Sequence, residues 1–353
     1  MKIALLCDTH FGGRSDSKTL LEHQASFFRD IFFPYIDQRS ITTVLHLGDI
    51  FDRRKYINFY TLKRSREFFF DELARRDIAM HAILGNHDTF FTTTNEVNSV
   101  SLLLREYSNI HIYENDVIHL DFGSTKIAMC PWLTKENNDK NLEAMKHSKA
   151  HILCGHFDMK GFEMMKGVVS DHGLDHKIFG HFEAVYSGHY HHQSQYGNVK
   201  YLGAQYEMNW SDYACKKGFH VLDTETRELT FIENTVKIYH KITYDDADLT
   251  IDDIACLETS VLKDCYVKVV VKNRTNPYLY DLFLNRLNDS GASDIKSVED
   301  SLNLSDTGME EVLDEAKDTK DILHSYIDAV ETSIDKSKIK RFMDQLYIEA
   351  LNI

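Results

Sequence analysis

Three apolar runs of strand length, with a helical pattern between each pair, constrain the fold of this chain most. The runs cover residues 2–7, 43–47 and 79–84, and the helical patterns cover residues 20–33 and 60–75. Successive runs begin about 40 residues apart, which leaves room for the crossover helix of a right-handed βαβ unit. The sequence therefore predicts an α/β fold, and we expect Pro34 to stop or kink the first helix.

Pattern and composition divide the 353 residues into four parts. Residues 1–240 form the main domain, and residues 241–290 form a small α+β module. Residues 291–318 are rich in Ser, Asp, Gly and Glu, which predicts a flexible linker, and residues 319–353 form a helical segment. Further strands are expected at 110–113, 125–129, 151–154, 182–187, 218–222, 228–232 and 265–271, and further helices at 142–148 and 278–288.

The last helical segment carries an apolar stripe with helical spacing. Its members are Ile339, Phe342, Met343, Leu346 and Tyr347. Such a stripe usually packs on its own domain, but the polar linker that precedes it favours docking in a groove between the helices of a partner protein. We therefore interpret these five residues as a partner-binding surface.

The net charge of −15 argues at first against a polyanionic substrate. Most of the excess lies late in the chain, because residues 241–353 hold 13 basic and 24 acidic side chains, whereas residues 1–240 hold 27 and 31. Bound cations would also reverse the local field of metal-binding carboxylates. Net charge therefore does not exclude a nucleic-acid substrate.

Composition also indicates the compartment. No run approaches the roughly 18 apolar residues of a membrane span, and the first residues do not resemble a secretory signal. The six cysteines lack paired spacings such as CxxC, which favours reduced thiols. We expect a soluble cytoplasmic protein with no membrane partner.

Short polar blocks follow five of the predicted strands. They span residues 8–10, 48–52, 85–88, 155–156 and 188–191. In open α/β sheets, ligands bind at the carboxyl ends of the strands, so we expect these blocks to converge. Residues two apart in an extended chain point to the same side, which would let Asp8 and His10 bind one ion.

Seven side chains in these blocks have the chemistry of metal ligands. They are Asp8, His10, Asp49, Asn86, His156, His189 and His191. Mixed nitrogen and oxygen donors suit manganese, iron or zinc better than calcium, and the set suffices for two ions if Asp49 bridges them. Two ions about 3.5–4 Å apart can activate a water and neutralise phosphoryl oxygens, so the sequence predicts a phosphoester hydrolase.

Three more residues of these blocks are candidates for catalytic roles. His87 could protonate the leaving oxygen, and Asp52 or Asp88 could orient a neighbouring histidine. A single histidine at a strand end is more often structural, but five blocks in a fixed order favour a metal site. His172, His176, His181 and His192 are not expected to be ligands.

These blocks resemble the pattern of the calcineurin-like metallophosphoesterase family: D-x-H, G-D-x-x-D, G-N-H-D, G-H and G-H-x-H. The resemblance implies an αββα sandwich core, followed here by a small capping module and a helical tail. It implies that Asp8, His10, Asp49 and His191 hold the first metal and that Asp49, Asn86, His156 and His189 hold the second. It also implies that His87 is the catalytic histidine.

Within that family, segments 48–55, 155–167 and 187–191 look most like nucleases that process DNA ends in recombination and repair. The likeness covers residues 1–240 well and the remainder only in layout. It implies manganese-dependent duplex exonuclease and single-strand endonuclease action. It further implies a DNA-recognising module at 241–290 and a homodimer within a heterotetramer, with an SMC-like ATPase bound to the C-terminal helices. Asp52 departs from close cellular relatives, which carry histidine there.

Basic residues near the blocks agree with a DNA substrate. Arg53, Arg54 and Lys55 follow the Asp49 block directly, and Arg14 follows the Asp8 block, so all four could contact phosphates. For each of them, a solvated loop is an equally good interpretation. Two other functions remain open: hydrolysis of small phosphoesters by the same metals, and a non-enzymatic scaffold that binds a partner through residues 319–353.

Overall fold

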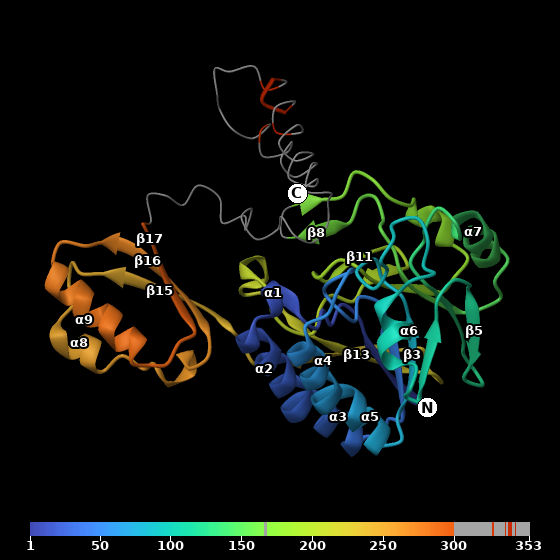
Figure 1. Ribbon diagram of the computed structural model, residues 1–353, viewed down its shortest axis with the longest axis horizontal. Helices are drawn as coiled ribbons and strands as arrows, with labels where there is room; N and C mark the ends of the chain where they lie inside the picture. Colours follow the sequence, from blue (N-terminus) through green and yellow to red (C-terminus); the bar gives the residue numbers. More distant parts are fainter. Residues whose placement is uncertain (166–167, 300–326, 328–335, 337, 341–342, 344–353) are drawn as a thin grey trace. The chain divides into compact units, whose positions relative to one another are not determined.

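The computed structural model describes residues 1–165, 168–299, 327, 336, 338–340 and 343. Its main domain contains two six-stranded sheets (Figure 1). The first sheet has the order β14-β13-β1-β2-β3-β4, and β1 to β4 run parallel. Its strands are β1 Lys2–Leu6, β2 Thr43–Leu47, β3 Ala79–Ile83, β4 Ile110–Tyr113, β13 Lys217–Asp223 and β14 Leu229–Asn234.

The second sheet has the order β11-β12-β10-β7-β6-β5, and its four central strands, β12, β10, β7 and β6, are parallel. Its strands are β5 Ile118–Asp121, β6 Lys126–Cys130, β7 Ile152–His156, β10 Ala184–Gly188, β11 Ser194–Tyr196 and β12 Val199–Tyr201. One buried cluster joins the two sheets, because Leu5 and Leu45 of the first belong to it together with Ile127 and Ile152 of the second.

Helices cover the outer face of each sheet. Phe28 and Phe69 pack with Val44 against the first sheet, and Met145 and Phe179 pack with residues of the second. The helical elements of the first layer are α2 Lys18–Phe27, η1 Phe28–Phe32, α3 Phe33–Gln38, α4 Phe59–Ser65, η2 Arg66–Phe70, α5 Asp71–Arg75 and α6 Ser99–Leu104, and those of the second are α7 Asn138–Lys146 and η3 His176–Phe179. The predicted αββα sandwich is confirmed.

The prediction that Pro34 ends the first helix is wrong. A π-helical turn, η1, precedes the proline, and the helical path continues in α3 to Gln38. Pro34 lies in the first turn of α3, where its missing amide hydrogen costs little and its fixed φ suits the helix. The helix therefore shifts its hydrogen bonding ahead of the proline and does not stop.

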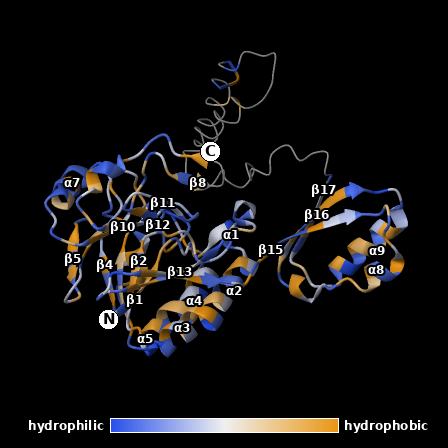
Figure 2. Ribbon diagram, turned by 180° about the vertical axis from the view of Figure 1, so that it is seen from behind, coloured by the Kyte–Doolittle hydropathy of each residue, from blue (hydrophilic) through white to orange (hydrophobic). Residues whose placement is uncertain are grey.

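A third sheet follows the sandwich. Three parallel strands in the order β15-β16-β17 form it: β15 Tyr239–Asp245, β16 Tyr266–Asn273 and β17 Asp294–Glu299. The helices α8 Ile251–Ala255 and α9 Pro277–Asn288 cover one face of this sheet (Figure 2). Shorter elements of the described chain are α1 Gly13–Asp16, β8 Glu163–Met165, β9 Val168–Val169, η4 Trp210–Asp212 and η5 Ser260–Leu262.

The predicted start of the linker at residue 291 is wrong for part of its length. Residues 294–299 form β17 and pair with β16, with Val267 opposite Ile295. The polar composition of this stretch hid the strand, because only Ile295 packs on the module's core. The remainder of the linker, residues 300–318, lies outside the described residues.

Few residues of the predicted helical segment are described. Ile339 and Met343 of the apolar stripe are helical, whereas Phe342, Leu346 and Tyr347 lie outside the described residues. Docking of this stripe on a partner therefore stays a prediction. Across the described part of the chain, no helix has both the length and the apolar character that crossing a membrane requires.

Candidate metal centre

The candidate ligands all follow the carboxyl ends of central strands. Asp8 follows β1, Asp49 follows β2, Asn86 follows β3, His156 ends β7 and His189 follows β10. Their donor atoms form three groups, each within 4.8 Å: Asp8 with His10 and His191, His10 with Asp49 and His87, and Asp49 with His156 and His189. Shared members link the groups, so five blocks from two sheets meet at one centre.

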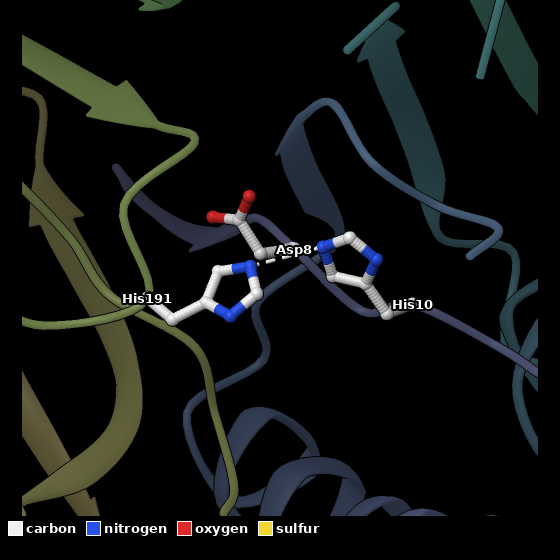
Figure 3. A group of neighbouring side chains, drawn as sticks. All are labelled: Asp8, His10 and His191. Carbon is white, nitrogen blue, oxygen red and sulfur yellow. Dashed lines mark hydrogen bonds between the residues drawn. The ribbon is translucent and has the colours of Figure 1, made fainter. Parts of the chain in front are cut away.

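Asp8, His10 and His191 make the first group (Figure 3). The Nε2 atoms of His10 and His191 lie 3.0 Å apart, as Figure 3 shows. One oxygen of Asp8 accepts the backbone N–H of His189 at 2.9 Å, and the other, Oδ2, is buried and has no hydrogen-bond partner among the described residues. Two facing imidazole nitrogens beside an unsatisfied buried carboxylate oxygen fit a bound cation.

Asn86 lies at the middle of the second group. Its Oδ1 is 3.0 Å from Nε2 of His156 and 3.0 Å from Nδ1 of His189. Nε2 of His156 is also 3.3 Å from a carboxylate oxygen of Asp49, and the same oxygen is 3.5 Å from Nε2 of His10. Asp49 therefore lies between the two groups, where a bridging carboxylate would have to be.

The hydrogen bonding of His156 fixes which nitrogen faces the centre. Its Nδ1 lies 2.7 Å from the carbonyl oxygen of Leu47, which can only accept, so Nδ1 carries a hydrogen and donates it. Nε2 is then the atom with a free lone pair toward Asn86 and Asp49. A carbonyl that holds the far nitrogen of a ligating histidine is the usual support of a metal site.

Burial and mutual charge shift the pKa values of this cluster apart. Burial would lower the pKa of His156, but Asp49 and Asp8 raise it to about 9. Burial would raise the pKa of Asp49, but His156 and His87 hold it well below its usual range. Burial and the charge of His156 lower the pKa of His189 to about 3. Such divergent pKa values are typical of functional sites.

Comparison with known proteins identifies the family. A model of the calcineurin-like phosphoesterase superfamily domain matches residues 1–171. The chain is 31% identical over 353 residues to exonuclease subunit 1 of Enterobacteria phage T4, and the match covers 99% of each protein. The chain belongs to the calcineurin-like phosphoesterase superfamily. The resemblance predicted from the five blocks is thereby confirmed, and membership in this family of metal-dependent enzymes implies divalent metal ions.

Two further matches are weaker. The SbcD component of the SbcCD nuclease of Staphylococcus epidermidis is 24% identical to the phosphoesterase over 265 residues, which cover 65% of this chain and 67% of the relative. A solved structure of an archaeal phosphodiesterase matches with 15% identity and a TM-score of 0.32, covering 66% of this chain and 100% of the other. That TM-score is too low to support an argument.

The prediction that strand alternation pairs Asp8 with His10 is wrong, although the two residues do meet. Strand β1 ends at Leu6, and both residues have positive φ, 51° at Asp8 and 42° at His10. Asp49 and His189 also have positive φ, 56° and 92°. Non-glycine residues rarely adopt this region, and such strain of about 1–3 kcal/mol each collects at functional sites. Tight turns, not strand alternation, direct these side chains inward.

Two glycines allow the blocks to approach. Gly48 has φ of 90°, and a Cβ there would lie 2.7 Å from Nδ1 of His156. A Cβ at Gly85 would lie 2.1 Å from Oδ1 of Asp49. Any larger residue at these positions would collide with a candidate ligand, which explains why both blocks begin with glycine.

Asp52 and His87 lie beside the first group. Oδ1 of Asp52 is 3.3 Å from Nδ1 of His10, and its backbone carbonyl accepts a hydrogen bond from Nδ1 of His87 at 2.6 Å. Asp52 thus contacts two histidines, as expected for an orienting residue. Because Nδ1 of His87 donates, its Nε2 is the nitrogen left to exchange a proton.

The prediction that Asp88 orients a histidine is wrong. Its carboxylate accepts four backbone N–H groups, from Asp49, Ile50, Phe51 and Gly85, at 2.8–3.2 Å. These bonds occupy both oxygens, so Asp88 fastens the second block to the third. A strand-end aspartate that follows a histidine gives no sequence signal for this role.

Sequence reasoning missed the residues that hold the first block. Gln24 Nε2 and the Tyr206 hydroxyl both donate to the carbonyl of Thr9, at 3.0 and 2.6 Å, and Gln205 Nε2 donates to the carbonyl of Cys7 at 2.6 Å. Trp132 was missed as well, and its ring lies 5.4 Å from that of His189. These positions carry no motif, since only the fold brings them to the block.

The predicted DNA contacts differ in their surroundings. Arg14 is engaged within the protein, because its guanidinium lies 4.5 Å from the ring of Tyr266 and donates to the Tyr239 hydroxyl at 3.1 Å. Arg53 lies 3.8 Å from the Asp16 carboxylate and 4.8 Å from the ring of Tyr56. Arg54 is half-exposed and Lys55 is exposed, and neither forms an ion pair within the described residues.

The four histidines that are not expected to be ligands lie outside the three groups. His181 Nε2 contacts the carbonyl of Met145 at 3.1 Å, and His172 lies 3.4 Å from Asp158. His192 is closest in sequence to a candidate ligand, but its ring turns to Asp212, with 3.3 Å between Nε2 and Oδ1. No donor of these three histidines joins the centre in the described part of the chain.

Proposed function

We propose that this chain is a manganese-dependent DNA nuclease, the nuclease subunit of a complex with an SMC-like ATPase. The observation that carries the proposal is the match over 99% of the chain to a protein named exonuclease subunit 1. The second relative is also named as part of a nuclease. The convergent centre supports the chemistry, because seven nitrogen and oxygen donors fit two divalent cations.

The donor geometry divides naturally between two cations. Asp8, His10, Asp49 and His191 would hold the first, and Asp49, Asn86, His156 and His189 would hold the second. When bound, the two cations would supply a water nucleophile of lowered pKa and Lewis-acid stabilisation of the phosphoryl oxygens. Mixed imidazole, amide and carboxylate donors suit manganese among the available metals.

The protein's own residues position and protonate the substrate. His87 keeps the hydrogen on Nδ1 for the carbonyl of Asp52, so a second proton, carried on Nε2, is available to the leaving oxygen of the cleaved ester. Asp52 holds the ring of His10 through Nδ1 and thereby keeps Nε2 of His10 aimed at Asp49. A positioned general acid such as His87 typically contributes about 10²–10⁴-fold to the rate.

Basic side chains around the centre would position DNA. Arg53, Arg54 and Lys55 continue directly from Asp52 and would contact phosphates beside the cleaved bond. The module of residues 241–290 would contact the strand further away. The face of its sheet opposite the helices carries Lys241, Lys268 and, on β17 beyond the predicted module, Lys296, which are directly opposite one another in three neighbouring strands.

Assembly follows from the same resemblance. The helical segment at 319–353, with the stripe from Ile339 to Tyr347, would bind the ATPase partner, after a linker that now begins after β17. Two copies of the chain would form the homodimer of a cytoplasmic heterotetramer. Duplex ends would be degraded by exonuclease action and single strands cut by endonuclease action.

An assay with end-labelled linear duplex and with circular single-stranded DNA tests this proposal. We expect cleavage of both only when manganese is added, and a reaction slower by about 100-fold or more for His87→Ser with the manganese content unchanged. His181→Ser is the matched control, because His181 lies outside the centre. Persistent absence of DNA cleavage with the ATPase partner present, together with turnover of a small chromogenic phosphodiester, would replace this proposal with a phosphoesterase of small substrates.

A further inference from the structure

The segment that follows Asp52 combines basic and aromatic side chains. Arg53, Arg54 and Lys55 are followed by Tyr56, which is 61% exposed, and by Phe59, which is 85% exposed. Large apolar side chains that are exposed together mark contact sites more often than isolated ones do. Neither ring has a role in the centre described above.

Both ends of this segment are anchored, so the rings project from a fixed backbone. Phe51, before it, is buried with an exposed fraction of 1%. Ile57, between the two rings, packs against the core of the main domain. Asn58 caps helix α4, because its Oδ1 accepts the backbone N–H of Tyr60 at 2.8 Å. A contact surface that is already ordered loses little conformational entropy on binding.

Cations accompany the rings. The guanidinium of Arg53 lies 4.8 Å from the ring centre of Tyr56 and is held by Asp16 at 3.8 Å. The ammonium of Lys18 lies 5.3 Å from the ring centre of Tyr60. Sites that bind single strands without sequence preference combine such features, since cations follow the phosphates and aromatic faces stack on the bases.

The segment also begins at the centre. Asp52 contacts the rings of both His10 and His87, at 3.3 and 2.6 Å. Tyr56 is four residues later, and four residues of extended chain reach at most about 14 Å. A nucleotide next to the cleaved phosphodiester would therefore lie within reach of Tyr56.

We propose that Tyr56 and Phe59 form a stacking platform for unpaired bases of the DNA strand whose phosphodiester occupies the centre. The inference rests on the proposed function and adds to it a determinant of preference for single-stranded over duplex substrate. Paired bases are stacked on each other and cannot offer a face to the platform. Each stacked base strengthens binding by about 5- to 150-fold.

Binding to the intact chain without divalent metal tests the platform. A fluorescein-labelled single-stranded oligonucleotide of about 12 nucleotides and a blunt duplex of the same sequence are titrated in EDTA with wild type and with Tyr56→Ala/Phe59→Ala. We expect the single strand to bind about tenfold or more weakly to the double variant and the duplex to change by less than about twofold. Tyr196→Ala and Tyr278→Ala are matched controls, because these tyrosines are 61% and 62% exposed at other sites.

Two additional measurements separate stacking from charge and from hydrophobic contact. The double variant loses no charge, so the slope of log K against log[NaCl] stays unchanged, whereas Arg53→Gln/Arg54→Gln/Lys55→Gln lowers it. Tyr56→Trp keeps the single-strand affinity and Tyr56→Leu loses it, since only the tryptophan keeps an aromatic face. Unchanged hydrolysis of a small phosphodiester shows that each variant has an intact centre.

The platform is refuted if wild type and the double variant bind the single strand equally, or if Tyr196→Ala causes the same loss. A change of oligomeric state in sedimentation, with DNA affinity retained, would assign the two rings to a second copy of the chain and would also overturn the inference. Absence of DNA binding and cleavage by wild type would instead refute the proposed function.

Discussion

The side-chain carboxylate of Asp88 accepts a hydrogen bond from the backbone amide of Asp49, with 2.8 Å between Oδ2 and N. Asp49 in return accepts the backbone amide of His87 through its own Oδ1 at 2.8 Å. The block after β2 and the block after β3 therefore hold each other through buried charge-assisted hydrogen bonds. The position of the candidate bridging ligand depends on a residue that does not itself face the centre.

Asp88→Asn should destabilise the fold. The amide nitrogen that replaces one oxygen cannot accept, so two of the four backbone N–H groups lose their partner. We expect the free energy of unfolding in urea to fall by about 3 kcal/mol or more. Asp121→Asn, at an exposed turn where Asp121 accepts only Gly123 N–H, should change it by less than about 0.5 kcal/mol. Equal stability of the two variants would contradict the fastening role.

Cation binding should release a proton from His156. In the metal-free protein its pKa is about 9, so at pH 7 it is protonated, and a ligand must be deprotonated. Manganese affinity should therefore rise about tenfold per pH unit from about 7 toward 9 and level off above. Titration calorimetry in PIPES and in Tris measures the released proton as a difference in enthalpy. His189, with a pKa of about 3, contributes none. The same enthalpy in both buffers would argue against this protonation state.

Asp52→Ala should weaken one cation more than the other. The alanine keeps the backbone carbonyl that His87 binds but removes the carboxylate 3.3 Å from Nδ1 of His10. Loss of such an outer partner typically costs about 10–100-fold in metal affinity, and we expect that loss for the first cation, which His10 would hold. Asp52→Asn retains an acceptor and should lose less. Competition titration with a metal indicator checks this, and equal loss at both cations would reject the assignment.

Lys217→Met should cost more stability than its position suggests. Lys217 and Asp212 form an ion pair in which each residue is only 1% exposed, and Nζ also donates to the carbonyl of His191 at 2.8 Å. Removing one partner leaves a buried charge, which typically costs about 3–5 kcal/mol. Lys149→Met, at an exposed position, serves as the control. A denaturation midpoint like that of the control would show that the pair contributes nothing.

The architecture was predictable where hydrophobic pattern and element length agree. The runs at 43–47 and 79–84 became β2 and β3 within one residue, because short apolar runs between helical patterns have few other solutions. Short edge strands such as β11 and β12 were missed, since three residues carry too little pattern. Strand β17 was missed for a different reason: its polar composition is that of a linker, and only pairing with β16 makes it a strand.

The sequence by itself determined which groups meet, and the tertiary structure decided how they meet. Five polar blocks behind apolar strands suffice to predict the convergence of Asp8, Asp49, Asn86, His156 and His189, because parallel strands end at one edge of a sheet. The positive φ of Asp8 and His10, the four amides around Asp88 and the capture of Arg14 by Tyr266 have no local signal. Each depends on contacts between residues far apart in the chain, whose energies strain or redirect a side chain only after the layers have packed.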